Sequence, residues 1–279
     1  MEIKAATPEH WPLLQPFYQL IYKPGHPLQN QAFWQWQFGN ATYGQAFIAI
    51  EKGQIAGHLG VSLSNGYAWH INLYIQPQYR NSPVLLSLIN AVGHLGLQGN
   101  INANMDAIRL YRLLGWYHYT PLIRMTCINP AMWGKPMDEV LSAITVTGAP
   151  GQPPAGHYWQ QPSLQGCSLS DGSQVVLQPN VGAMRLATIA SPKKALQQAW
   201  DMGFGWVDYI TSFNNPILPK LEKGGWQTDA ESNIPWLLNP VVKNRLSNIS
   251  FLTQKPIPID FYINRTHSDI GRVGSLPSI

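Results

Sequence analysis

The sequence contains one short pattern twice. Each copy has a Ser-Pro pair, a stretch with helical spacing, an asparagine and a Gly-Trp pair. The members are Ser82-Pro83, Asn104 and Gly115-Trp116 in the first copy, and Ser191-Pro192, Asn214 and Gly225-Trp226 in the second. The asparagine precedes the tryptophan by 12 positions in both copies. A repeat of this length corresponds to a whole supersecondary unit, so the sequence predicts two related halves that pack together.

The composition is that of a folded globular protein with few charged groups. The 279 residues can bury a core for one large domain or two medium ones. Charged residues make up 11% of the chain, against about 25% in typical soluble domains. The net charge of +4 reflects few acidic residues rather than many basic ones, and no cluster of Lys or Arg is visible. We therefore expect no nucleic-acid partner.

Neither a metal site nor a membrane span is expected. The two cysteines, Cys127 and Cys167, form no C-x-x-C motif and lack the partner spacing of a zinc site. The N-terminal residues do not resemble a signal peptide, and no run of 18 apolar residues occurs. We expect a cytoplasmic protein without a bound metal.

Apolar periodicity predicts strands and helices in both halves. Expected strands are 2–6, 46–50, 54–63, 67–76, 99–103 and 117–128, then 174–178, 183–190, 206–211, 249–253 and 258–264. Expected helices are one that starts at Thr7-Pro8-Glu9 and ends at Pro24-Gly25, then 31–38, 83–95, 105–114, 192–200 and 216–223. Residues 148–173 are rich in Pro, Gly, Ser and Gln, which is typical of a connecting loop. The predicted fold class is therefore α/β (α+β).

Two segments of the first half resemble a known superfamily. INLYIQPQYRNSPVLLSLINAVGHLG, residues 71–96, resembles the central strand, loop and helix of the GNAT (Gcn5-related N-acetyltransferase) superfamily. The pattern Asn104-x-x-Ala107-x-x-x-Tyr111-x-x-x-Gly115-Trp116 resembles its last helix. The resemblance covers about residues 2–128, and the repeat extends it to 183–264. It implies two GNAT-like halves, each a mixed, mostly antiparallel twisted sheet flanked by helices.

The resemblance also implies a division of labour between the halves. Residues 1–130 would form a GNAT-like domain that binds the acyl donor, and 131–173 a linker. Residues 174–279 would form a degenerate copy, because Leu221 stands where the first copy has Tyr111. We expect this second domain to form the wall of the acceptor pocket.

In enzymes of this superfamily an acyl thioester lies where two neighbouring strands part, here 70–76 and 99–103. The implied donor is acetyl-CoA or a longer acyl-CoA. Its pyrophosphate would lie at a helix N-terminus, where free N–H groups and the helix dipole favour anions. The residues that the resemblance assigns to the donor are Leu73, Tyr74, Ile75, Arg80, Asn81, Ser82, Val84 and Asn104. For Asn104, capping of the last helix is an alternative role.

The phosphate loop departs from the superfamily pattern Q/R-x-x-G-x-G/A. Arg80 matches its first position, but Pro83 and Leu85 replace the two small residues. Glycine lets the backbone approach a phosphate closely, and proline has no N–H to offer. The donor would bind in an altered way, or would be a thioester carried on an acyl carrier protein, which presents a single phosphate.

The resemblance assigns catalysis to direct attack of an amine on the thioester. Tyr111 matches the tyrosine that protonates the departing thiolate; the alternative is a core aromatic residue. His70 stands where related enzymes often place a carboxylate base, and histidine titrates near neutral pH. The alternative is a hydrogen-bonded histidine within a strand.

Candidate acceptor residues lie on the hairpin and in the polar tail. His58 lies on the hairpin next to the central strand. His267 and Asp269 alternate on the tail, so they would point to one side of an extended segment, and Arg272 follows them. The acceptor would be an amine on a small molecule, a sugar or a peptide. The alternative for the tail is an exposed C-terminal loop.

The leading hypothesis is an N-acyltransferase, and two others stay open. A Fem-type aminoacyltransferase that uses charged tRNA would need a basic face, which the sequence does not show. A non-catalytic ligand-binding protein would suit the altered loop and the degenerate second half.

Overall fold

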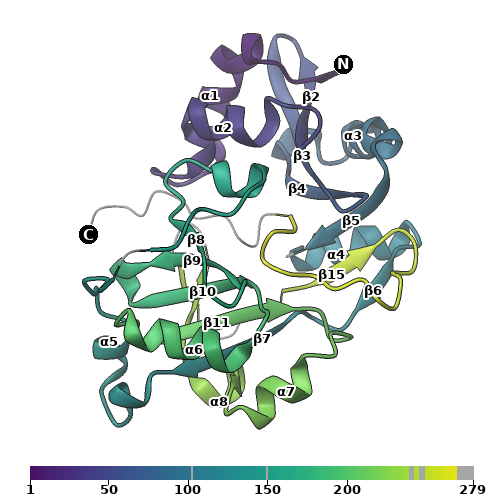
Figure 1. The fold of residues 1–279 in the computed structure, drawn as a ribbon. Coiled ribbons are helices and arrows are strands. Elements are labelled where there is room, and N and C mark those ends of the chain that lie inside the picture. Colours follow the sequence, from purple (N-terminus) through teal and green to yellow (C-terminus); the bar gives the residue numbers. More distant parts are fainter. Residues whose placement is uncertain (102, 149, 239–241, 245–248, 269–279) are drawn as a thin grey trace.

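The computed structural model describes residues 1–279 except 102, 149, 239–241, 245–248 and 269–279. In this part of the chain two mixed sheets lie in two halves, each flanked by helices (Figure 1). The seven-stranded sheet has the order β1 (Glu2–Ala5), β2 (Gly44–Glu51), β3 (Gln54–Ser64), β4 (Tyr67–Ile75), β5 (Leu97–Ile101), β15 (Phe251–Thr253), β6 (Tyr117–Tyr119). The six-stranded sheet has the order β12 (Gln227–Thr228), β7 (Ile123–Ile128), β11 (Trp206–Thr211), β10 (Ala183–Thr188), β9 (Gln174–Gln178), β8 (Gly166–Ser168). A separate pair joins β13 (Trp236–Leu238) and β14 (Val242–Asn244).

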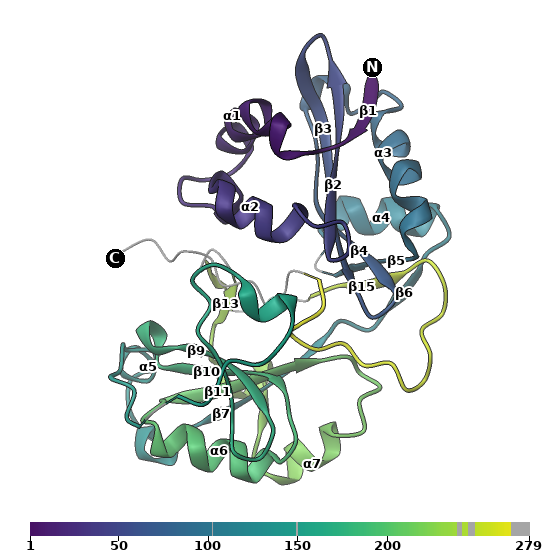
Figure 2. The same cartoon turned by 45° about the horizontal axis from the view of Figure 1, so that its top comes forward.

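Helices cover both faces of the first sheet. The helices are α1 (Trp11–Ile21), α2 (Gln31–Phe38), α3 (Val84–Val92), α4 (Met105–Leu113), α5 (Met137–Val140), α6 (Pro192–Asp201), α7 (Leu218–Lys223) and α8 (Asp229–Ser232). α1 and α2 pack on one face, and α3 packs on the other (Figure 2). α3 comes close because Gly57 has no side chain, and a Cβ there would lie 2.8 Å from Val84. This packing fixes α3 beside the end of β4.

Both halves contain the same local arrangement. β4 and β5 are parallel and joined through α3, and β10 and β11 are parallel and joined through α6. The following helices, α4 and α7, end at Gly115 (φ 79°) and Gly225 (φ 81°), a left-handed conformation that favours glycine. In each copy the next tryptophan N–H donates to the carbonyl oxygen five residues earlier, at 3.0 and 3.1 Å. The Gly-Trp pairs of the sequence pattern therefore occupy the same place in both copies, whereas the asparagines do not: Asn104 caps α4, and the Asn214 amide donates to the carbonyl oxygens of Ile259 and Phe261.

The two halves exchange a strand. β7, from the first half of the sequence, pairs with β11 and β12 in the second sheet. β15, from the end of the chain, pairs with β5 and β6 in the first sheet. The single strand expected over 117–128 is therefore wrong, since it splits at Pro121, which cannot donate to a ladder. The sheets do not divide at residue 130, and the assignment of separate domains stays a prediction.

A buried ion cluster holds the exchanged strand β7. Asp208 on β11 binds Arg124 on β7 (3.0 Å), Arg185 on β10 (2.7 Å) and Arg265 (2.6 Å). Arg124 also binds Asp229 at 3.0 Å. Burial by itself would raise the pKa of Asp208, but the three guanidinium groups hold it well below its usual range. Because β7 and the segment after β15 both reach Asp208, this cluster joins the two halves.

One expected linker, 131–173, and one expected strand, 258–264, differ from the structure. The expected linker 131–173 contains α5 and β8, and Cys167 within it is fully buried in the second core. The strand expected over 258–264 is a loop, and its proline Pro258 offers no N–H for pairing. No helix in the described part of the chain is long and apolar enough to span a membrane.

Candidate functional site

β4 and β5 part within the first sheet. They pair in register from Tyr67 opposite Leu97 to His70 opposite Asn100, and β4 then runs on to Ile75 beside β3. A β-bulge accompanies this parting. The register between β3 and β4 shifts after His58, which is the mark of the bulge. Asn72 in the bulge has φ 51°, which asparagine tolerates better than most residues. The expected donor segment, Leu73 to Ile75, lies beyond this point.

His58 holds the bulge from inside the core. Its Nδ1 donates to the carbonyl oxygen of Asn72 at 2.9 Å. Its Nε2 therefore accepts, and the Tyr18 hydroxyl donates to it at 2.9 Å. The Trp34 indole N–H donates to the same hydroxyl at 3.1 Å. His58 is fully buried, and burial lowers its pKa to about 4. The structure thus gives His58 a contact that shapes β4, while its role toward an acceptor stays a prediction.

The two catalytic candidates contact each other where β4 and β5 part. The Gln98 amide donates to the carbonyl oxygens of Val92 (3.2 Å) and Gly96 (2.7 Å), so its oxygen faces His70. His70 Nε2 donates to that oxygen at 2.6 Å. His70 Nδ1 is then an acceptor, and the Tyr111 hydroxyl donates to it at 2.8 Å. The chain of bonds fixes both the tautomer of His70 and the direction of the tyrosine proton.

Burial sets the protonation of this pair. Both side chains are fully buried, with Trp116 stacked on the Tyr111 ring at 4.3 Å. Burial lowers the pKa of His70 to about 4, against the Gln98 hydrogen bond, and raises the pKa of Tyr111 above its usual value. Both groups are therefore uncharged at neutral pH. Both ring nitrogens of His70 already have partners, and its assignment as a base stays a prediction.

Asn100 completes the cluster and is not among the residues that the sequence predicts for the site. Its amide donates to the backbone oxygen of His70 at 2.8 Å. Its side-chain oxygen is buried and has no hydrogen-bond partner among the described residues, and the residue is 8% exposed. A buried acceptor without a donor is costly unless a ligand supplies one. Polar residues at alternate positions of a buried strand, Gln98 and Asn100, were the signal.

The expected phosphate loop lies at the start of α3. Arg80 and Asn81 are exposed there, and Ser82 Oγ donates back to the Tyr79 carbonyl oxygen at 2.6 Å. Pro83 is the N-cap of α3, and its own side chain makes no capping hydrogen bond. Val84 N–H has only a long contact, 3.4 Å, with Ser82 Oγ. The first turn of α3 therefore presents backbone N–H groups, while the proline supplies none.

The remaining predicted residues lie elsewhere. Asn104 caps α4, since its side-chain oxygen accepts from Ala107 N–H at 2.9 Å. His267 is buried and bonds to Asn65 at the tip of the β3–β4 hairpin. Asp269 and Arg272 lie outside the described residues. Within the described residues, no group of three or more His, Cys, Asp or Glu side chains is arranged to hold a metal ion.

No protein-family model and no curated protein sequence matches the chain. A solved structure does, a putative acetyltransferase from Pyrococcus horikoshii, with a TM-score of 0.54. It is 13% identical, and the match covers 94% of this chain and 92% of that one. The fold is GNAT-like.

Two further matches are weaker. A conserved protein from Enterococcus faecalis, described as a probable N-acyltransferase, is 11% identical with a TM-score of 0.49, over 76% of this chain and 65% of that one. Arabidopsis thaliana NAA60, solved with a bisubstrate analogue, is 17% identical with a TM-score of 0.35, over 44% of this chain and 86% of that one. The GNAT-like fold is the result that the following proposal uses.

Proposed function

We propose that this protein is an N-acyltransferase that moves an acyl group from a CoA-type thioester to an amine. One observation carries the proposal: the Tyr111 hydroxyl donates to His70 Nδ1 where β4 and β5 part, and the Asn100 amide donates to the His70 backbone oxygen at the same place. The likeness of the fold to a putative acetyltransferase supports the same reaction class. The acyl chain length and the acceptor are left to experiment.

The thioester would lie along β4 beyond the bulge. The pantetheine arm would pair with the backbone of Leu73 to Ile75, as an additional strand does in β-augmentation. The pyrophosphate would accept from N–H groups in the first turn of α3 and from Arg80, which is exposed beside it. The unpartnered oxygen of Asn100 would accept an N–H from the donor or the amine.

The reaction that this arrangement suits is direct transfer. The amine nitrogen attacks the carbonyl carbon, the C–N bond forms and the C–S bond breaks. Tyr111 gives its proton to the departing sulfur, and the proton lost by the amine nitrogen restores the tyrosine. Burial raises the pKa of Tyr111, which keeps the hydroxyl protonated until the thiolate forms. His70, bonded to that hydroxyl at 2.8 Å, would be a positioning residue.

The altered loop favours a second form of the donor. Pro83 removes one N–H from the loop, and Leu85 replaces a small residue. A thioester on an acyl carrier protein presents a single phosphate and depends less on these positions. Both donors share the phosphopantetheine thioester, so comparison of free acyl-CoA with an acylated carrier protein distinguishes them.

Substitution of Tyr111 by Phe tests the reaction. The variant should lose about 100-fold in kcat, the usual contribution of a general acid, with little change in acyl-CoA affinity. Tyr117→Phe is the matched control, since Tyr117 is 49% exposed. Full turnover in Tyr111→Phe contradicts the proposed acid. Binding of thioester without any turnover in the wild-type protein, across amines of several classes, supports the non-catalytic alternative. The full burial of Tyr111 and His70 also favours that alternative.

A further inference from the structure

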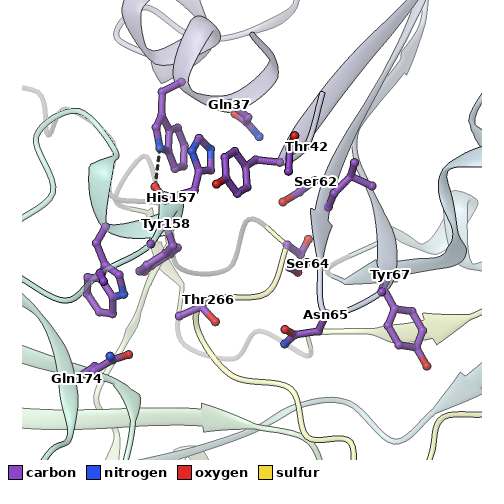
Figure 3. A pocket seen from close by; sticks show the side chains of 18 of the residues that line it. Gln37, Thr42, Ser62, Ser64, Asn65, Tyr67, His157, Tyr158, Gln174 and Thr266 are labelled. Carbon is purple, nitrogen blue, oxygen red and sulfur yellow. Dashed lines mark hydrogen bonds between the residues drawn. The ribbon is translucent and has the colours of Figure 1, made fainter. Parts of the chain in front are cut away.

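A cavity of about 600 Å³ lies between the two halves, apart from Tyr111 and His70. Its walls come from the end of α2, the β3–β4 hairpin, residues 155–159 and the end of the described chain at Thr266 and Ser268 (Figure 3). Tyr67 also lines it, three residues before His70, which is about 10 Å along a strand. The cavity is therefore a site of its own, within the usual size of a small-molecule pocket.

The walls that the described residues form carry no charged side chain. None of the described residues that line the cavity is an Asp, Glu, Lys or Arg. Hydroxyl and amide side chains from both halves reach it instead, among them Gln37, Ser62, Asn65, Gln174, Thr188 and Thr266. Such groups both donate and accept hydrogen bonds. A ligand with many hydroxyl groups would find partners on all sides.

Aromatic rings form one side of the cavity. His157 from the second half is stacked between Trp36 (centroids 5.2 Å apart, planes at 11°) and Tyr43 (4.1 Å, 3°). The Trp36 indole N–H donates to the His157 carbonyl oxygen at 3.0 Å. Tyr43 lines the cavity and is 40% exposed, with one ring face against His157, so part of this side chain is accessible to a ligand. An accessible aromatic ring offers a flat apolar surface to the C–H face of a sugar ring.

The surroundings disfavour charged ligands. Burial raises the pKa of Tyr158 in the cavity wall, against the opposing influence of Arg265 and Arg185. The two charges behind this influence are positive, so they offer no attraction to a polycation. These arginines are themselves bound to Asp208 and do not line the cavity. An anion would therefore lose water without a paired cation at the wall.

We propose that this cavity binds a neutral, polyhydroxylated ligand, a sugar of one to three rings without ionised groups. Its rings would pack on the accessible part of the Tyr43 side chain, and its hydroxyls would bond to the amides and hydroxyls of the opposite wall, such as Gln174. The proposal concerns binding alone and does not rest on acyl transfer.

Calorimetric titration of the whole chain, with no thioester present, tests the proposal. The probes are glucose, maltotriose, chitotriose, a trisaccharide of uronic acids and kanamycin. At least one neutral saccharide should bind at millimolar or lower concentration. Tyr43→Ala and Gln174→Ala, on opposite walls, should each weaken that binding about tenfold. Tyr117→Ala, an exposed aromatic residue outside the cavity lining, should leave it unchanged.

Three results overturn the proposal. The first is no heat from any neutral saccharide at millimolar concentration. The second is tighter binding of kanamycin or the uronic acid than of every neutral probe. The third is unchanged neutral-sugar binding in both wall variants, with their folding verified by thermal melting. Since no donor is present in the titration, a failure here leaves the thioester assays untouched.

Discussion

Acidification from pH 7 to pH 5 should remove a large part of the stability of this protein. Burial lowers the pKa of His58, His70 and His267 to about 4 in each case. A histidine in the unfolded chain has a pKa of about 6.5. The unfolded chain therefore binds more protons below pH 6.5, and the free energy of unfolding falls as the pH falls toward 4.

The size of the effect follows from these pKa values. Proton linkage gives a loss of about 1.8 kcal/mol per histidine between pH 7 and pH 5, or about 5.5 kcal/mol for the three. Total stabilities of domains are about 5–15 kcal/mol, so this loss is large. His157, whose pKa burial also lowers, acts in the same direction. Asp208 does not contribute between pH 7 and pH 5. Its pKa is lowered in the folded protein, and an ordinary Asp pKa of about 3.9 keeps it ionised in the unfolded chain as well.

Urea unfolding at pH 7, 6 and 5 measures the effect. The free energy of unfolding of the wild-type protein should fall by about 5.5 kcal/mol over this range, with an unchanged m-value. His70→Gln removes one of the three groups, so its pH dependence should be about a third smaller, whatever its stability at pH 7. A wild-type loss below about 1 kcal/mol would refute the reasoning, because the folded protein would then protonate these histidines as readily as the unfolded chain.

Three other perturbations test separate parts of the structure. Asp208→Asn leaves three buried arginines without their shared carboxylate, and should cost about 3–5 kcal/mol in urea unfolding; a cost below about 1 kcal/mol would contradict the cluster's role. Residues 1–130 alone lack β15, so they should show no cooperative melting until residues 131–279 are added; a cooperative transition of the fragment alone would argue against the exchange. Pro83→Gly adds a backbone N–H to the loop, so acyl-CoA should bind several-fold more tightly; an unchanged affinity would place the phosphate elsewhere.

Local elements of the fold could be predicted from the sequence, but the pairing of its last strands could not. The pattern of Phe33, Trp34 and Phe38 predicts a helix over 31–38, and α2 has those bounds. Strands 174–178 and 206–211 also have the predicted bounds. The exchange of β7 and β15 escaped prediction because apolar periodicity identifies a strand without identifying its neighbour.

For the candidate site, too, the sequence predicts individual residues but not the contacts between distant segments. Spacing on α4 identified Tyr111, and the position in β4 identified His70, and the structure brings these two together at 2.8 Å. The fixed tautomer of His70 depends on its contact with Gln98, 28 positions away along the chain. The cavity between the halves combines segments as distant as Gln37 and Thr266, so no local pattern could indicate it.

We propose that a phosphopantetheine thioester lies along β4 where it parts from β5. A thermal-shift titration with free CoA, acetyl-CoA and acyl-CoAs of increasing chain length tests it most directly. Saturating donor should raise the melting temperature, since ligand at 100 times its Kd stabilises a fold by about 2.7 kcal/mol. An increase that grows with chain length would indicate a long-chain donor, and an equal increase with every acyl-CoA a short one. No increase with any of these compounds would contradict the account.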